Sequence, residues 1–368
     1  KLTSADRGVS WLPLYHDMGL VGCFLAPIAS QFSADLFATK DFVRRPLLWP
    51  ELFSRNRATI TYAPSFGYDL AVRRARGKAP EGMDLSTWRV AGIGGDMIKA
   101  PTLRAFAETF GPAGFDPNAF TPSYGMAETT LALSFAPLRQ GLRTERLDLG
   151  ALERDMTARP PAADGPARDF ALCGPPLPRH GIEIRDDAGA PAAEGIVGRI
   201  FASGPSLMRG YFGDEPATKA ALGPDGWLDT GDLGFMRGGQ IVVTGRAKDL
   251  MVVNGRNIWP QDLEWTIERN VEHAREGGVA AFSITPDDRG REIDETVVVV
   301  AECRLRDAAE REAFRKAVRA AVREAHGVEA EAALAPNGAL PRTSSGKLSR
   351  SKARRLFLDG AFEPAATA

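Results

Sequence analysis

Several short stretches of the chain bring acidic, basic, aromatic and hydroxyl side chains together beside turns, where such groups could serve a chemical reaction. PSYGMAETTLALSF (122–135) places Tyr124, Glu128 and Thr129 after a Pro/Ser/Gly bend and before an apolar run. Four further stretches carry residues of the same kind: His16 and Asp17 in WLPLYHDMGLVG, Asp229 and Asp232 in GWLDTGDLG, Arg246, Lys248 and Asp249 in VTGRAKDLMVVNGRNIWPQDLE, and Lys347 in LPRTSSGKLSR. Each alone has a structural interpretation, because a turn glutamate is usually solvated and a lone histidine usually structural. Their order along the chain is the stronger signal.

Two stretches approach known phosphate-binding loops but differ from them at decisive positions. PRTSSGKLSR (341–350) contains a Gly-Lys pair, but Pro341 stands where a P-loop has its first glycine, and Leu348 where it has the Mg²⁺-binding Ser/Thr. GIGGDM (92–97) ends on Met97, where a dinucleotide fingerprint has Gly or Ala. Both loop types are therefore excluded.

The elements that must position these residues divide the chain into two parts. Up to about residue 247, ATITYAPS (58–65) and WRVAGIGG (88–95) indicate buried strands, and 100–111 has helical spacing. GIEIRD and VGRIFASGP predict strands of a smaller β region. After residue 248 the predicted order is strand, turn, helix, strand, strand, helix, strand, loop, helix. In that part Pro260 falls in a first helical turn, and a later helix has Asp307 as N-cap and Gly327 at its end.

Composition narrows the class of protein. The chain has 368 residues, 44% hydrophobic and 25% charged, which favours two globular domains. Lys plus Arg number 46 and Asp plus Glu 47, so no global basic field exists to recruit nucleic acid. The composition does not exclude a local basic patch. The three scattered cysteines offer no metal cluster and fit a reducing cytoplasm. GLVGCFLAPIA is too short to span a membrane, so we expect no integral membrane segment.

The ordered motifs resemble the adenylate-forming superfamily, which contains acyl-CoA synthetases, luciferases and peptide-synthetase adenylation domains. YGMAETT, GWLDTGDLG, GRAKDLMVVNGRNIWPQDLE and PRTSSGK are similar to its successive core motifs. SWLPLYHDMGLVG, PSYGMAETTLALSF and GRNIWPQDLE resemble the fatty acyl-AMP ligases more narrowly. The resemblance implies an α/β plus α+β fold. A large N-terminal adenylation domain (1–247, incomplete, with a small β-barrel-like region) precedes a small mobile C-terminal domain (248–368).

The resemblance implies roles for individual residues. Tyr124 would stack on adenine, and Asp232 would accept hydrogen bonds from the ribose hydroxyls. Arg246 would donate to the ribose or a phosphate, and Glu128 would help to hold Mg²⁺. His16 would lie beside the acyl carboxylate, Lys347 would stabilise charge at the α-phosphorus of ATP from a flexible TSSG loop, and Lys248 would be the hinge between domains. The remaining expected nucleotide-binding residues are Gly94, Gly95, Asp96, Ser123, Gly125, Met126 and Thr129.

The sequence differs in two regions from the most general pattern of the superfamily, and both differences affect the expected activity. The superfamily's Ser/Thr/Gly-rich phosphate loop would precede SWLPLYHDMG, and the sequence begins just downstream of that position. We therefore expect weak or no adenylation by this chain alone. Residues 68–90 resemble the segment that carries the ligases' extra insertion, which in that subfamily restrains the domain rotation needed to use CoA. Their basic run RRARGK is equally compatible with a solvated helix end.

The resulting functional hypothesis is an ATP- and Mg²⁺-dependent fatty acyl-AMP ligase. It would activate a medium- or long-chain fatty acid and pass the acyl group to the phosphopantetheine thiol of an acyl carrier protein, as in polyketide or lipopeptide synthesis. Two alternatives remain open. One is an acyl-CoA synthetase, and the other is a catalytically incomplete chain that only binds nucleotide, acyl chain or carrier protein.

Overall fold

The structure is a computed structural model, and it describes residues 2–163, 165–285, 295–343 and 346–362. It divides into two compact units. The first contains Lys1–Asp148 and Thr157–Thr244, and the second contains Leu149–Met156 and Gly245–Ala368. The main part of the second unit begins at Gly245, and the sequence predicts a domain boundary between residues 247 and 248. The second unit also includes a short segment, 149–156, that the sequence interpretation assigned to the first domain.

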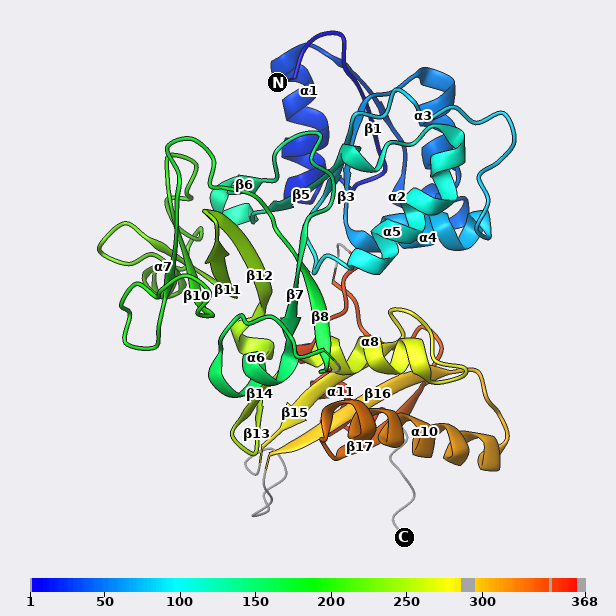
Figure 1. Ribbon diagram of the computed structural model, residues 1–368, viewed down its shortest axis with the longest axis vertical. Coiled ribbons are helices and arrows are strands. Elements are labelled where there is room, and N and C mark those ends of the chain that lie inside the picture. The colour runs from blue at the N-terminus through cyan, green and yellow to red at the C-terminus, as the bar shows by residue number, and fades with distance from the viewer. Residues whose placement is uncertain (1, 164, 286–294, 344–345, 363–368) are drawn as a thin grey trace. The chain divides into compact units, whose positions relative to one another are not determined.

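The first unit is built on a six-stranded sheet with the order β2-β1-β3-β4-β5-β6 (Figure 1). Neighbouring strands among β1 to β5 pair in parallel, whereas β6 runs antiparallel to β5. The strands are β1 (Arg7–Ser10), β2 (Ser33–Leu36), β3 (Ile60–Ala63), β4 (Val90–Ile93), β5 (Phe120–Tyr124) and β6 (Ser134–Phe135). Because parallel strands need crossover connections, helical segments separate them. These segments are η1 (Met18–Leu25), α1 (Ala26–Ser30), α2 (Thr39–Arg44), α3 (Leu48–Asn56), α4 (Ser65–Ala75), α5 (Ala100–Phe110), η2 (Gly111–Ala113) and η3 (Pro117–Ala119).

An aromatic core joins helices α2 to α5 to one face of this sheet (Figure 1). Trp11, just after β1, stacks on Phe42 of α2 with 4.0 Å between ring centroids. Phe106 of α5 is completely buried and meets Tyr68 of α4 edge-on at 5.0 Å and Trp88 at 5.8 Å. Such close packing fixes the strand ends that carry the candidate site.

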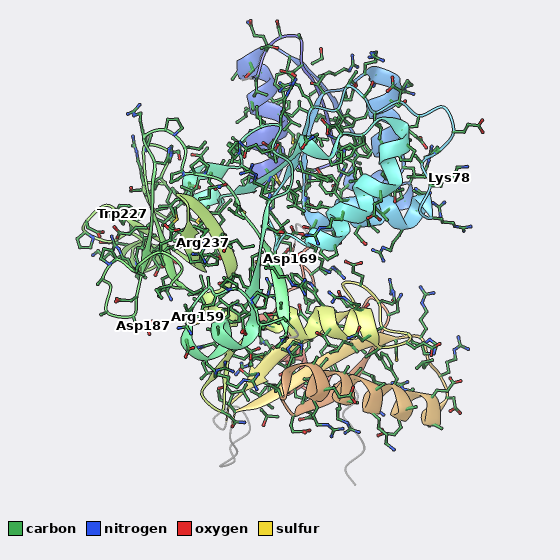
Figure 2. All side chains as sticks on the ribbon, in the orientation of Figure 1. Lys78, Arg159, Asp169, Asp187, Trp227 and Arg237 are labelled. Carbon is green, nitrogen blue, oxygen red and sulfur yellow. The ribbon has the colours of Figure 1, made fainter. Side chains whose placement is uncertain are left out.

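The segment 68–90 contributes to this core at both ends. Tyr68, Leu85 and Trp88 are buried. The basic run RRARGK between them is the exposed C-terminal end of α4 and the turn that follows, and Lys78 projects from it (Figure 2). The basic run is therefore a solvated helix end, and the correspondence of segment 68–90 to the ligases' insertion stays a prediction.

A second, antiparallel sheet in the same unit has the order β12-β11-β10-β9. Its strands are β9 (Gly181–Arg185), β10 (Gly198–Ser203), β11 (Leu228–Arg237) and β12 (Gln240–Arg246), and α7 (Glu215–Ala221) precedes β11. A separate ladder pairs β7 (Thr144–Asp148) with β8 (Ala167–Ala171). These elements form the smaller β region that the sequence predicts.

The second unit is a three-stranded sheet, β15-β16-β17, covered by helices on both faces. Alternate residues of β16 point to opposite faces, so that Val297 and Val299 pack with α8 and α10 while Val298 and Val300 pack with α11. Its elements are α6 (Leu149–Asp155), η5 (Ala247–Asp249), β13 (Met251–Val253), β14 (Arg256–Ile258), α8 (Pro260–Asn270), β15 (Val279–Ile284), β16 (Thr296–Cys303), α10 (Ala308–His326), β17 (Ala330–Pro336) and α11 (Arg350–Leu358).

Among the described residues from Met251 onward, the predicted element order is correct except for β14, a short strand that pairs with β13 before α8 begins. The predicted helix boundaries are confirmed. Pro260 is the first residue of α8, and the Asp307 carboxylate accepts a hydrogen bond from the Glu310 amide at 3.0 Å. Gly327 ends α10 with φ +62°, a conformation that glycine adopts without strain. The mixed α/β and α+β architecture is therefore confirmed.

Within the part of the chain that the structure describes, no helix is both long enough and apolar enough to cross a membrane.

The aromatic core predicts a large stability difference between two phenylalanine substitutions. Phe106→Ala should lower the free energy of unfolding by about 3–5 kcal/mol, because it empties a fully buried ring site. Phe212→Ala is the matched control, since that ring is fully exposed and its loss should change stability by less than about 0.5 kcal/mol. Urea unfolding of both variants measures the difference, and similar midpoints would contradict this account of the core.

Candidate active site

The expected glycine-rich segment and the expected tyrosine turn follow neighbouring parallel strands. Gly94, Gly95 and Asp96 come directly after β4, and Tyr124 is the last residue of β5. The two strands are hydrogen-bonded in parallel, so both segments leave the sheet at its carboxyl edge. Ligands of open α/β sheets bind at this edge.

Close backbone packing explains why glycine is needed in this segment. The Ser123 hydroxyl donates a hydrogen bond to the Ile93 carbonyl at 3.0 Å. A Cβ atom at Gly94 would lie 2.7 Å from that hydroxyl, which is closer than such contacts are found. The Asp96 carboxylate accepts from the Ser65 amide at 3.0 Å, at the start of α4. Asp96 therefore helps to position the β3–α4 turn at the same edge.

The turn after Tyr124 is equally compact. A Cβ atom at Gly125 would lie 1.9 Å from the Leu131 carbonyl oxygen, so only glycine fits there. The segment continues through Met126 into a single 3-10 turn, η4 (Ala127–Thr129), in which the buried Thr129 hydroxyl donates to the Met126 carbonyl at 2.9 Å. These contacts fold the turn back on itself and present Glu128 at its tip.

Tyr124 and Asp232 meet across the first unit. The Tyr124 hydroxyl donates to Asp232 Oδ2 at 2.8 Å, and both residues are buried. Asp232 lies on β11, where the pairing with β10 jumps from Arg199↔Leu233 to Phe201↔Asp229. Gly231, with φ +72°, lies inside this bulge. β-Bulges turn a side chain in a new direction, and this one accompanies the approach of Asp232 to Tyr124.

The neighbouring acid, Asp229, has a different environment. Its carboxylate accepts from Arg199 at 2.6 Å and from the Gly231 amide at 2.9 Å. Asp229 thereby stabilises the bulge, whereas Asp232 accepts the hydrogen bond from Tyr124. The structure thus distinguishes two acids that are three positions apart in GWLDTGDLG.

Glu128 is held by the loop that precedes α7. The Tyr211 hydroxyl donates to Glu128 Oε1 at 2.9 Å, and the Met208 amide donates to the Glu128 carbonyl at 2.7 Å. Burial and the adjacent carboxylate raise the pKa of Tyr211, so it remains a donor at neutral pH. Among the described residues no group of three His, Cys, Asp or Glu side chains could enclose a metal ion. A single half-buried carboxylate nevertheless suits Mg²⁺, which takes its other ligands from phosphates and water.

His16 follows β1 and therefore lies at the same edge of the sheet. Its Nδ1 atom is 2.5 Å from Asp17 Oδ1, and the Met18 amide also donates to the Asp17 carboxylate at 2.7 Å. The side chain is 24% exposed, so it remains accessible to a ligand.

Three expected residues belong to the second unit. Arg246 ends β12 and Lys248 lies in η5, and both are exposed. Lys347 is half-buried, and its backbone is paired with Thr343: the Thr343 amide donates to the Lys347 carbonyl at 2.8 Å. Of the TSSG stretch expected to be flexible, Ser344 and Ser345 lie outside the described residues.

Sequence reasoning missed two contributors to the site in the first unit. Gly231 carried a usable signal, because a glycine inside a strand pattern suggests a bulge. Tyr211 carried none, since its contact with Glu128 joins positions far apart in the chain.

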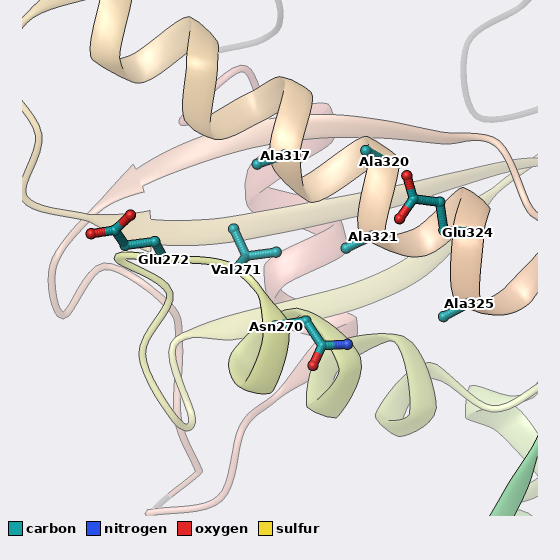
Figure 3. A pocket seen from close by; sticks show the side chains of 8 residues that line it. All are labelled: Asn270, Val271, Glu272, Ala317, Ala320, Ala321, Glu324 and Ala325. Atoms are coloured by element: carbon teal, nitrogen blue, oxygen red, sulfur yellow. The ribbon is translucent and has the colours of Figure 1, made fainter.

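A groove of about 450 Å³ lies in the second unit between the end of α8 and α10 (Figure 3). Its lining comprises Asn270, Val271, Glu272, Ala317, Ala320, Ala321, Glu324 and Ala325. None of these is an expected site residue, so the groove is separate from the candidate chemistry.

Comparison with known proteins identifies the family. The family model described as "AMP-binding enzyme" matches residues 1–212. A putative acyl-CoA synthetase from Caulobacter vibrioides is 54% identical over 98% of this chain. JamA from Moorena producens, a medium-chain-fatty-acid–[acyl-carrier-protein] ligase, is 32% identical over 98% of this chain. A solved structure from a study of fatty acyl-adenylate ligases from E. coli and L. pneumophila has a TM-score of 0.90 at 44% identity over 98% of this chain.

This chain spans 63%, 62% and 63% of the lengths of those three proteins, respectively. The family match covers more than half of the chain and includes Gly94, Tyr124 and Glu128. The resemblance to the adenylate-forming superfamily and its fatty acyl-AMP ligases is thereby confirmed. The chain belongs to the family of AMP-binding enzymes.

Proposed function

We propose that this protein activates a medium- or long-chain fatty acid with ATP to give an acyl-adenylate and pyrophosphate. The buried hydrogen bond between Tyr124 and Asp232 is the observation that carries this proposal. It fixes an aromatic ring and a carboxylate together at the carboxyl edge of a parallel sheet, in a chain of the AMP-binding family. A ring and a carboxylate so arranged suit the two halves of adenosine, the base and the ribose.

The remaining residues receive roles in nucleotide binding. In this proposal the backbone groups of Gly94, Gly95 and Gly125 contact the base. The hydrogen bonds of Asp96, Ser123, Met126 and Thr129 hold those segments in shape. Arg246 contributes donors to the ribose or a phosphate. Glu128 would hold Mg²⁺, which when bound neutralises phosphate charge.

The adenylation step joins the fatty carboxylate to the α-phosphorus of ATP. The new oxygen–phosphorus bond forms as the bond to pyrophosphate breaks, and negative charge accumulates on the α-phosphate oxygens. Lys347 supplies a compensating positive charge, and His16 positions the carboxylate. We assign Lys248 to the hinge that separates this step from the next.

In the second step a thiol attacks the acyl carbon and AMP departs with the bonding electrons. An acyl carrier protein is the proposed thiol donor, and the 32% identity to JamA supports it. The 54% identity to a putative acyl-CoA synthetase favours CoA as the alternative. The buried free thiols Cys23, Cys173 and Cys303 are compatible with action in the cytoplasm.

A product assay by mass spectrometry tests the proposal. The chain is incubated with ATP, Mg²⁺, a fatty-acid mixture and either CoA or a phosphopantetheinylated carrier protein. Acyl-AMP, even in low yield, that persists with CoA and is consumed by the carrier protein is the expected result. Formation of acyl-CoA would indicate that the protein is an acyl-CoA synthetase. Neither product, together with calorimetric binding of a non-hydrolysable acyl-AMP mimic, would indicate a chain that only binds.

The role of Lys347 predicts a separation of the two steps. Lys347→Ala should slow adenylation on the order of 100-fold or more, because the charge at the α-phosphate is lost. Thioester formation from supplied acyl-AMP should continue. Lys352→Ala is the matched control, an exposed lysine on α11 that should affect neither step. Equal loss of both steps in Lys347→Ala would contradict the assignment.

The bulge at Gly231 predicts a change in nucleotide affinity that is separable from stability. Gly231→Ala and Gly239→Ala each place a side chain at φ near +72° with no atom within 4 Å, so each should lose about 1 kcal/mol of unfolding free energy. Gly239 lies in the β11–β12 turn and serves as control. Only Gly231→Ala should weaken AMP binding, by about tenfold, because the altered bulge would displace the neighbouring Asp232 side chain. Isothermal titration calorimetry measures the affinity of each variant for AMP. Equal affinities of Gly231→Ala and Gly239→Ala would refute the role of the bulge.

A further inference from the structure

Arg350 occupies an unusual position in the second unit. It is the first residue of α11, and its side chain is only 21% exposed. Its Nε and Nη2 atoms donate to the two oxygens of Glu264, both at 2.7 Å. Its Nη1 atom donates to Asp249 Oδ2 at 3.0 Å. One guanidinium therefore joins α11 to α8 and to η5.

The charges and burial make this a strong and specific contact. The Glu264 side chain is 5% exposed, and its Oε1 atom also accepts from the Ala281 amide of β15 at 3.0 Å. Burial opposes the charge of Arg350, but Glu264 and Asp249 outweigh it and raise the pKa of the guanidinium. Paired hydrogen bonds to one carboxylate need the planar fork of arginine, which a lysine does not reproduce.

Arg350 and its partner Asp249 each lie close in sequence to a residue with an assigned role. Asp249 directly follows Lys248, the proposed hinge, and Lys347 is three residues before Arg350. The chain between Lys347 and α11 is short and fixed, since the Ser349 amide donates to the Pro341 carbonyl at 2.9 Å. Close to Pro341, Arg342 Nη2 donates to the Gly277 carbonyl at 2.6 Å.

We propose that Arg350 is a positioning residue. It anchors the segment 346–349, which carries Lys347, and the hinge turn η5 to the same point of the second unit. The bidentate contact with Glu264 sets where α11 starts, and so fixes the backbone that carries Lys347. The single contact with Asp249 holds η5 to that point. The importance of Lys347 rests on the proposed function, whereas the anchor itself is a property of the second unit.

Amide hydrogen exchange of the whole chain tests the anchor without requiring activity. Arg350→Gln should accelerate exchange at the Lys347 amide and at the Leu250 amide by about tenfold or more, because both segments lose their charged contact. Asp249→Asn should accelerate exchange at Leu250 alone, since Glu264 still holds Arg350. Arg355→Gln is the matched control, because that α11 side chain is 84% exposed and its variant should change neither amide.

The outcomes separate a positioning role from a merely structural one. Unchanged exchange at Lys347 in Arg350→Gln, or acceleration spread equally over α10 and β16, would overturn the proposal. If Arg350→Gln does not fold, Arg350→Lys replaces it, and acceleration at Lys347 is again expected because the fork is lost. Where the wild-type chain forms acyl-AMP, Arg350→Gln should reduce kcat for adenylation by about tenfold with the KM for ATP unchanged. Absence of wild-type product would refute the proposed function and leave the exchange result to decide the anchor.

Discussion

Parallel pairing of β1, β3, β4 and β5 is the constraint on which the candidate site depends. Parallel strands all leave the sheet at one edge, so His16, Asp96 and Tyr124 emerge together although they are widely separated in sequence. The helices between the strands bury their aromatic side chains on one face of the sheet. That packing holds the strand ends still, and the turns that follow them can then be short, strained or glycine-rich.

Buried polar groups add a second level of order, because each must find a partner. Tyr124 and Asp232 satisfy one another and connect the parallel sheet of the first unit to its antiparallel sheet. In the second unit Arg350 does the same for Glu264 and Asp249. Directional bonds of this kind specify the orientation of a side chain more narrowly than apolar packing does. They are therefore found where a side chain or a loop must be held in one place.

The local features of the chain could be predicted from sequence because their causes are local. Asp307 caps a helix, and Gly327 ends it, through bonds to residues only a few positions away. Tyr211 contacts Glu128 across 83 positions, and no periodicity or spacing encodes that approach. For the same reason the sequence alone does not separate residues 149–156 from the first domain, whereas they pack in the second unit. Glu153 of α6 meets Arg256 and Asn257, which lie more than a hundred positions later.

The buried thiols bear on how an acyl group would be carried. A cysteine nucleophile must reach its thiolate form, and a reactive one has a lowered pKa in a partly exposed, electropositive site. Burial instead raises the pKa of Cys23 to about 11 and that of Cys173 to about 12. Both remain protonated at neutral pH and are enclosed by the first unit. Neither suits acyl transfer through a covalent enzyme intermediate, which agrees with the proposed function, in which AMP carries the activated acyl group until an external thiol accepts it.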